Sequence, residues 1–167
     1  MSVVAEHAIV SIQVADFAMA DPGGKATIVG SGISVLTHTA GKESTTRFSV
    51  VVEIEVPYDL LPQDFPIEIA LVDNTGGLVA PGGGQPLRIA QLASVERPQR
   101  TTGLAYPREA LRGRTRMVVD FAQGLPIPAE AAYAWRVMVD GDETRAWTYP
   151  FAVATSGAAT AGGPVIG

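Results

Sequence analysis

The stretch Phe48-Ser-Val-Val-Val-Glu-Ile-Glu-Val-Pro57 decides the fold of this chain. Its even-numbered residues are all apolar up to the closing valine, and its odd-numbered residues include one serine and two glutamates. An apolar residue at every second position is typical of a β-strand with one face in a core and the other mostly in water. We therefore predict a strand over residues 45–56, which Pro57 ends because proline has no N–H to donate to a neighbouring strand.

The same alternation recurs along the chain, with glycine- and proline-rich turns between the segments. It predicts about eight short strands, the pattern of a β-sandwich or barrel. We expect an all-β, antiparallel sandwich of the immunoglobulin-like, Greek-key type. At most two short helices fit the remaining sequence, within residues 58–65 and 108–112. The predicted strands cover residues 8–19, 26–38, 45–56, 67–71, 86–95, 114–121, 133–139 and 147–153.

The last two strands form the clearest predicted hairpin. The dipeptide Asp140-Gly141 between them is preferred in tight hairpin turns. Their alternating aromatic and aliphatic residues indicate that this hairpin supplies the heaviest part of the core. These residues are Tyr133, Trp135, Val137 and Val139, followed by Trp147, Tyr149, Phe151 and Val153.

Two of the predicted strands contain an irregularity. In the first, Phe17 falls out of the apolar register, which predicts a bulge or twist near Asp16. In the second, Gly30 and Gly32 interrupt the strand, and glycine inside a strand usually marks a bulge or a close backbone approach.

The composition limits the kinds of protein that this chain can be. Its 167 residues fit one domain, which we place at residues 1–154. Cysteine is absent, so disulfides, thiol catalysis and zinc–thiolate sites are excluded. Hydrophobic residues make up 47% and charged residues 17%, below the roughly 25% charged residues of an average soluble domain. This balance indicates either a large core or a surface that a partner covers.

Charge and hydropathy patterns argue against two classes of partner. The net charge of −5 disfavours nucleic-acid binding. The sequence has no apolar run of the length that a transmembrane helix needs. Glu6 and His7 interrupt the start of the chain, where a signal peptide has a basic region followed by an apolar run. We expect a cytoplasmic or virion-associated protein without nucleic-acid or membrane partners.

Candidates for catalysis are few. The two histidines, His7 and His38, lie outside any ligand-spacing motif, and we expect a surface or capping role for His38. Ser31 lies between two glycines but lacks the spacing and the following helix of a nucleophile elbow. Gly82-Gly83-Gly84 lacks the Gly-Lys-Ser/Thr ending of a phosphate loop, which favours a flexible loop.

The acidic residues have a simple structural explanation. Glu53 and Glu55 share one strand face, and Glu68 would join them if it lies on a neighbouring strand, but the alternation itself predicts a solvated sheet face. Asp140-Gly141-Asp142-Glu143 has oxygen ligands suited to calcium without the spacing of an EF-hand loop, which favours a charged hairpin tip. We predict no catalytic, cofactor-binding or metal-binding residue.

An arginine-rich insertion over residues 97–113, continued to residue 116, is the charge feature that suggests an interaction. Segment 97–116 holds six of the 12 Lys and Arg residues and one acidic residue, Glu109. Guanidinium groups suit bidentate contacts to carboxylates, so one interpretation is a dock for an acidic partner, such as a neighbouring copy. The alternative is that these arginines pair within the fold. They are Arg97, Arg100, Arg108, Arg112, Arg114 and Arg116.

Residues 155–167 form an Ala/Gly-rich tail. Such a composition cannot bury enough apolar surface to become ordered alone. We expect that a neighbouring chain would have to order it, and we add its largest apolar residues to the candidate interaction residues. These are Pro164, Val165 and Ile166.

Three stretches of the sequence form a recognisable combination. The first leads from Ala15-Asp16-Phe17-Ala18 to Ile28-Val29-Gly30-Ser31-Gly32. The second joins residues 53–58 to residues 67–76, and the third joins Leu125-Pro-Ile-Pro128 to residues 133–141. Over most of residues 8–153, this combination resembles a family of uncharacterised bacterial β-sandwich domains with relatives in bacteriophage genomes. The resemblance implies a β-sandwich without an established activity, so it transfers no residue role.

We therefore expect a non-enzymatic structural or interaction protein, a component of a larger assembly such as a virion-like particle. Its expected partners are proteins, other copies of the same chain among them, and no cofactor is expected. The alternative is a sandwich that binds a small ligand or a carbohydrate, which would require exposed aromatic rings or convergent polar groups. The candidate rings are Tyr58, Tyr106 and Trp147.

Overall fold

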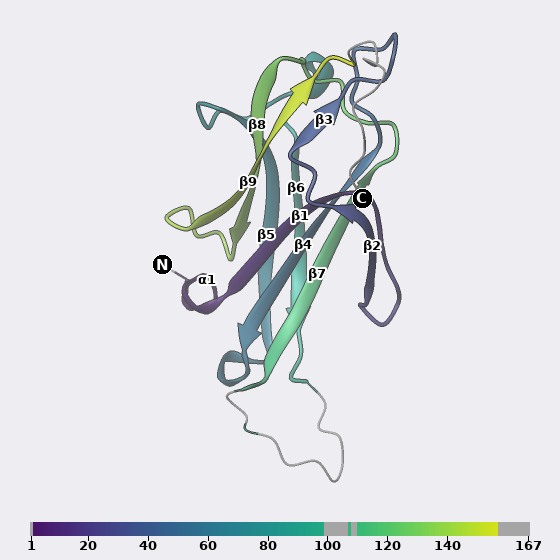
Figure 1. Ribbon diagram of the computed structural model, residues 1–167. Helices are drawn as coiled ribbons and strands as arrows, with labels where there is room; N and C mark the ends of the chain where they lie inside the picture. The colour runs from purple at the N-terminus through teal and green to yellow at the C-terminus, as the bar shows by residue number, and fades with distance from the viewer. Residues whose placement is uncertain (1, 99–106, 108–109, 157–167) are drawn as a thin grey trace, which may run out of the picture.

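The computed structural model describes residues 2–98, 107 and 110–156, and within them nine strands form two sheets (Figure 1). The first sheet contains β1 (Ile9–Ala20), β2 (Ala26–Ser31), β4 (Phe48–Pro57) and β7 (Arg112–Phe121), in the order β2-β1-β4-β7. The second contains β3 (Val35–Thr37), β5 (Gln63–Asp73), β6 (Arg88–Val95), β8 (Ala131–Val139) and β9 (Ala146–Ala154), in the order β3-β9-β8-β5-β6. The helical segments are α1 (Val3–His7), η1 (Tyr58–Leu60) and η2 (Pro81–Gly83).

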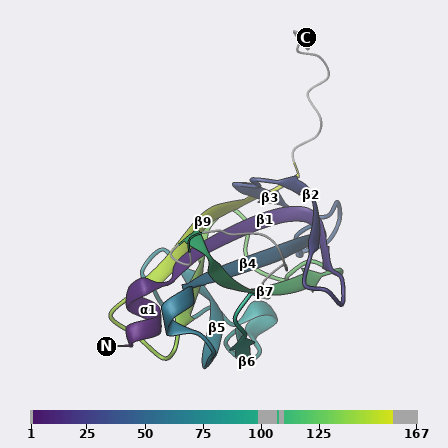
Figure 2. The same cartoon turned by 90° about the horizontal axis from the view of Figure 1, so that it is seen from below.

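The predicted all-β sandwich is confirmed. The neighbours β1-β4-β7 and β5-β8-β9 follow the strand order A-B-E and C-F-G of an immunoglobulin-type sandwich. Seen from below, β1 runs the length of its sheet, from α1 near the N-terminus to its pairing with β2 (Figure 2). Asp140 and Gly141, with φ of 55° and 67°, form the predicted turn, but residues 140–145 lie between β8 and β9, so the hairpin loop is longer than this dipeptide.

One predicted strand is wrong, because residues 26–38 form two strands that lie in different sheets. Gly32, with φ of 95°, starts the crossing, and the N–H groups of Gly32 and Ile33 both donate to the Val14 carbonyl. The second of the two strands, β3, then pairs in parallel with β9. The sandwich is therefore not wholly antiparallel, and the nine strands exceed the predicted count by one.

The core lies between the two sheets and is built from the predicted alternation. In β4 every even-numbered residue from Phe48 to Val56 is at most 1% exposed. Trp135 of β8 is fully buried, and its ring centre lies 5.3 Å from that of Phe121 and 6.2 Å from that of Phe48. This cluster joins the two sheets across the middle of the sandwich.

Tyr133 combines the core with the chain entry to β8. Its ring lies 5.8 Å from that of Phe151, and its hydroxyl donates to the Pro128 carbonyl at 2.9 Å. This is the arrangement of the tyrosine corner of immunoglobulin-like domains, in which a tyrosine near the start of strand F bonds to the backbone a few residues upstream. Burial raises the pKa of Tyr133 above its usual value of 10.0. The bond fixes the loop that precedes β8.

The end of β1 separates from β4 while it stays paired with β2, at the place near Asp16 where the register of Phe17 predicts a bulge or twist. β1 pairs with β4 as far as Ala15, and the Ala18 N–H donates to the Ser49 hydroxyl instead of a β4 carbonyl. We call residues 16–31 the β1–β2 arm. It lies over the outer face of β4, because the Arg116 side chain on β7 donates to the Gly24 carbonyl at the tip of the arm. Ser49 is consequently buried although it faces away from the core.

The short helical segments agree only in part with the sequence. The single helical turn expected within residues 58–65 is confirmed as η1. In the predicted helix 108–112, Ala110 has 3-10 geometry and its N–H donates to the Pro107 carbonyl at 3.2 Å, whereas Arg112 lies in β7; residues 108 and 109 lie outside the described residues. The predicted insertion over residues 97–113 consequently ends before Arg112. No helix within the described part of the chain has the length and apolar character to cross a membrane.

Candidate functional site

The structure describes four of the six candidate arginines, and each of these contacts another part of the same chain. Arg97 donates from Nε to the Leu61 carbonyl at 2.7 Å, and its guanidinium lies 5.6 Å from the centre of the Tyr58 ring. The other three project from β7. The remaining candidates lie outside the described residues: Arg100, Arg108, Pro164, Val165 and Ile166.

The three arginines of β7 form a charge ladder with the glutamates of β4. Arg116 pairs with Glu53, and Arg114 pairs with Glu55 at 2.8 Å. Arg112 Nε lies 3.5 Å from the other Glu55 oxygen. For these residues the contacts agree with the alternative interpretation, in which the arginines pair within the fold. Apart from Arg114, these side chains are only 19–27% exposed, so the ladder is a partly buried sheet face that is paired within the fold and not a vacant dock.

Glu68 does not join this acidic pair. It lies on β5, in the opposite sheet, so the idea that it shares a face with Glu53 and Glu55 is wrong. Its carboxylate accepts two hydrogen bonds from Arg88, at 3.2 and 2.5 Å. The pattern of alternation shows which side a residue faces but not which sheet contains it. Within the described residues, no cluster of three or more His, Asp or Glu side chains has a metal-binding arrangement.

The acidic tip of the β8–β9 hairpin is held together by its own hydrogen bonds. Asp142 accepts from the Thr144 hydroxyl at 2.6 Å, from the Thr144 N–H at 2.9 Å and from the Ser2 N–H at 3.0 Å. These donors, with the Thr144 hydroxyl first, lower the pKa of Asp142 from 3.8 to about 2. Asp142 therefore attaches the N-terminal segment to the hairpin. Both of its carboxylate oxygens accept hydrogen bonds from the protein, so the structure does not identify it as part of a cation site.

The low pKa of Asp142 predicts how stability depends on pH. The folded-state pKa is below the unfolded-state value, so the contribution of Asp142 to the free energy of unfolding is present above about pH 4. It is lost as the pH falls from about 4 to about 2. Asp142→Asn should flatten the pH dependence of stability in this range, measured by urea denaturation at successive pH values. An unchanged slope in the variant would contradict this assignment.

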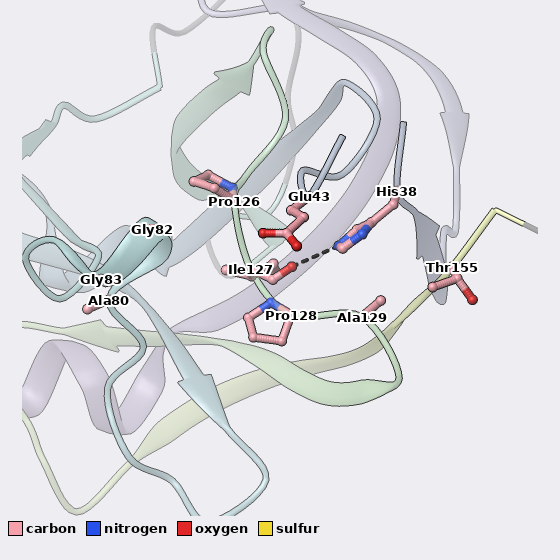
Figure 3. Close-up of a pocket in the computed structure, with 10 residues that line it drawn as sticks. All are labelled: His38, Glu43, Ala80, Gly82, Gly83, Pro126, Ile127, Pro128, Ala129 and Thr155. Carbon is pink, nitrogen blue, oxygen red and sulfur yellow. Dashed lines mark hydrogen bonds between the residues drawn. The ribbon is translucent and has the colours of Figure 1, made fainter. Parts of the chain in front are cut away.

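The cavity at one end of the sandwich is the candidate functional site. It has a volume of about 690 Å³ and is lined by residues from four separate segments. The segment 126–129 runs through the middle, with the β5–β6 loop on one side and the β3–β4 loop and the end of β9 on the other (Figure 3). The lining is mostly apolar and comprises His38, Glu43, Ala80, Gly82, Gly83, Pro126, Ile127, Pro128, Ala129 and Thr155.

Hydrogen bonds of backbone groups and of the His38 side chain hold these segments in place. The Gly82 N–H donates to the Pro126 carbonyl at 2.7 Å, which attaches the β5–β6 loop to the central segment. From the other side, His38 donates from Nε2 to the Ile127 carbonyl at 2.8 Å, and its own N–H donates to the Ala154 carbonyl at 3.0 Å. The cavity is thus a preformed feature, and the expected capping role of His38 agrees with its bonds.

The end of β9 is fixed by an acidic side chain. The N–H and the hydroxyl of Thr155 donate to Glu130 Oε1, at 3.1 and 2.9 Å. These two bonds lower the pKa of Glu130, since they favour its ionised form. The chain therefore leaves the last strand from the wall of the cavity.

The cavity combines an apolar lining with few ionisable side chains. Its ionisable side chains are His38 and Glu43, and the His38 Nε2 atom is engaged by the Ile127 carbonyl. Among the described residues, the Thr155 hydroxyl donates to Glu130 and not to His38, so no histidine activates it as a nucleophile. Apolar side chains with a few polar groups at the rim are typical of sites that bind an apolar group.

The aromatic residues considered for carbohydrate binding are not arranged as an exposed pair. Arg97 lies over the Tyr58 ring, and Arg145 lies 5.6 Å from the centre of the Trp147 ring. Trp147 and Tyr58 are both partly buried, and Trp147 packs against the core. Tyr106 lies outside the described residues.

The sequence did not identify the cavity. Its loops were expected as isolated turns, because each contains proline or glycine and no chemical motif. The Pro-Ile-Pro of residues 126–128 is a signal that could have indicated a stiff, exposed apolar segment, since proline restricts its own backbone and that of the preceding residue.

Comparison of the chain with models of protein families, with curated proteins and with solved structures found no match.

Proposed function

We propose that this protein is a non-enzymatic interaction component of a larger assembly, and that it contacts neighbouring copies through its surface and its C-terminal tail. The observation that carries the proposal is the apolar, preformed cavity from whose wall the chain leaves the last strand. Apolar surface that is concave and rigid favours association, because little ordering is required when a partner binds. Charged residues make up only 17% of the chain, which also supports a protein whose surface is partly covered by a partner.

The arginine-rich segment has a smaller part in this proposal. Arg97, Arg112, Arg114 and Arg116 already contact groups of the same chain, so the arginines that would meet an acidic partner are narrowed to Arg100 and Arg108, outside the described residues. A virion-like setting remains an extension of the same proposal.

A truncation tests the proposal. The full chain should elute from size-exclusion chromatography with a light-scattering mass of two or more chains, whereas residues 1–156, which retain all nine described strands, should give the mass of one chain. Equal melting temperatures for the two proteins would show that the truncation leaves the fold intact. A single-chain mass for both proteins at all concentrations would contradict the proposal.

The cavity also supports a second candidate function, the binding of a small apolar ligand. Its volume of about 690 Å³ lies within the range of roughly 300–1,000 Å³ that is usual for ligand pockets. A ligand that binds the 1–156 protein and the full chain with equal affinity would favour this candidate over association through the tail.

A further inference from the structure

We propose that the cavity is the docking site for residues Pro164-Val165-Ile166 of a second copy of this chain. The inference rests on the proposed function and names the surface and the segment that meet. The segment that would fill the cavity lies outside the described residues, and it would come from a neighbouring copy of the chain.

The chemistry of the cavity matches that segment. The cavity presents Ala80, Pro126, Pro128 and Ala129, and its polar groups are confined to His38, Glu43 and Thr155 on one side (Figure 3). Residues 155–167 contain no charged side chain, and their largest apolar side chains are those of residues 164–166. The side chains of this segment are uncharged, so they lose no ionic hydration in such a cavity, and their burial removes apolar surface from water on both sides.

The backbone of the cavity is prepared for an incoming segment. The central segment is bound to the β5–β6 loop through Gly82 and to the β3–β4 region through His38, as described above. The Tyr133 hydroxyl donates a hydrogen bond to the Pro128 carbonyl and so fixes its position. Since these groups are fixed before binding, the site requires little ordering when it is filled.

The tail is long enough to extend from the end of β9 into the cavity of a neighbouring copy. Thr155 lines the cavity itself, and residues 156–163 separate it from Pro164. Eight residues span at most about 26–29 Å when fully extended. That length suffices to enter the cavity of a copy that meets this end of the sandwich.

The direction of the chain favours a neighbouring copy over the same chain. β9 runs toward the end of the sandwich that holds the cavity (Figure 1), and at Thr155 the ribbon continues away from Pro128 and Gly82, on the far side of the cavity (Figure 3). To fill its own cavity, the tail would have to reverse its direction within residues 156–163, whereas the cavity of a copy that faces this end lies ahead of the exit. Pro164 also biases the preceding residue to an extended conformation. Two copies meeting end to end around a two-fold axis would exchange tails without a reversal.

Two substitutions in the full chain test the docking. Ala129→Glu places a charge in the cavity, and Ile166→Asp places one on the tail; each should weaken self-association at least tenfold, measured by sedimentation velocity. Pro128→Glu is a second cavity variant at an exposed position, in case Ala129→Glu lowers stability. Ala132→Glu, on the exposed outer face of β8, is the matched control and should leave association unchanged.

A peptide identifies the receptor site directly. A synthetic peptide of residues 156–167, added to the full-length Ile166→Asp protein, should bind saturably and shift the NMR resonances of His38, Ala80 and Ala129. The same peptide should bind at least tenfold more weakly when Ala129→Glu is added to that protein. Absence of binding, or shifts confined to another surface, would overturn the inference.

The outcomes separate the inference from the proposed function. If the full-length variants Ala129→Glu, Pro128→Glu and Ile166→Asp each self-associate as strongly as the unmodified chain, the proposed docking site is wrong and the assembly proposal stands. If the full chain is monomeric and its cavity resonances already match those of the peptide-saturated protein, its own tail fills the cavity and the second copy is excluded. If the full chain is monomeric and its cavity is empty, both proposals fail.

Discussion

Replacing Trp135 with alanine is expected to lower the free energy of unfolding by about 3–5 kcal/mol. Trp135 is fully buried, and its ring lies near those of Phe48, Phe121 and Phe151, with centres 5.3–6.2 Å away. Alanine would remove contacts with both sheets and leave a cavity that the paired strands cannot close by collapsing. The loss should be measured by equilibrium denaturation in guanidinium chloride.

The second tryptophan provides a matched control. Trp147 is partly exposed and lies at the edge of the core, so Trp147→Ala should cost clearly less than Trp135→Ala. Equal losses for the two variants would contradict the assignment of Trp135 as the centre of the core. The Trp135 Nε1 atom has no hydrogen-bond partner among the described residues. The side chain therefore stabilises the fold through packing, with no hydrogen bond added.

Replacing Gly124 with alanine should be the most damaging single-methyl change near the cavity. Gly124 has φ of 67°, where a side chain costs about 1–2 kcal/mol. A Cβ atom there would also collide with the backbone carbonyl of Thr45, and overpacking of this kind costs about 1–3 kcal/mol more. Thr45 exchanges two hydrogen bonds with Leu125, both at 2.9 Å, so the collision would displace the segment that enters the cavity.

The turn glycine Gly141 separates the two causes. Its φ is also 67°, but a Cβ atom would meet nothing within 4 Å. Gly141→Ala should therefore lower stability only by the backbone strain, and thermal melts of the two variants should show the larger loss for Gly124→Ala. A loss for Gly141→Ala as large as that for Gly124→Ala would refute the close contact with Thr45.

The features that the sequence predicted well are local ones. Side chains alternate with a period of two in any strand, so the buried face of β4 could be read from residues 48–56 alone. The turn at Asp140-Gly141 and the helical turn after Pro57 are local in the same way, since each depends on backbone preferences of two or three residues. The departure of β1 near Asp16 was likewise visible, as a break in the apolar register.

The features that the sequence did not predict depend on which strands become neighbours. The crossing between β2 and β3 places two halves of one apparent strand in different sheets, and alternation alone cannot detect this. Glu53 and Glu55 are spaced by two, as are Arg114 and Arg116, so their pairing could have been proposed once β4 was placed beside β7. The cavity depends on three loops and the end of β9, which are distant in sequence and whose residues carry no common motif.

The most direct test of the account is an isotope-filtered NMR experiment on a mixture of two full chains, one labelled with ¹³C and one unlabelled. The account predicts intermolecular NOEs between the methyl groups of Val165 or Ile166 in one copy and Ala129 or Ala80 in the other. NOEs between these residues that arise only within one chain, or a mixture in which the tail methyls contact no cavity residue, would contradict it.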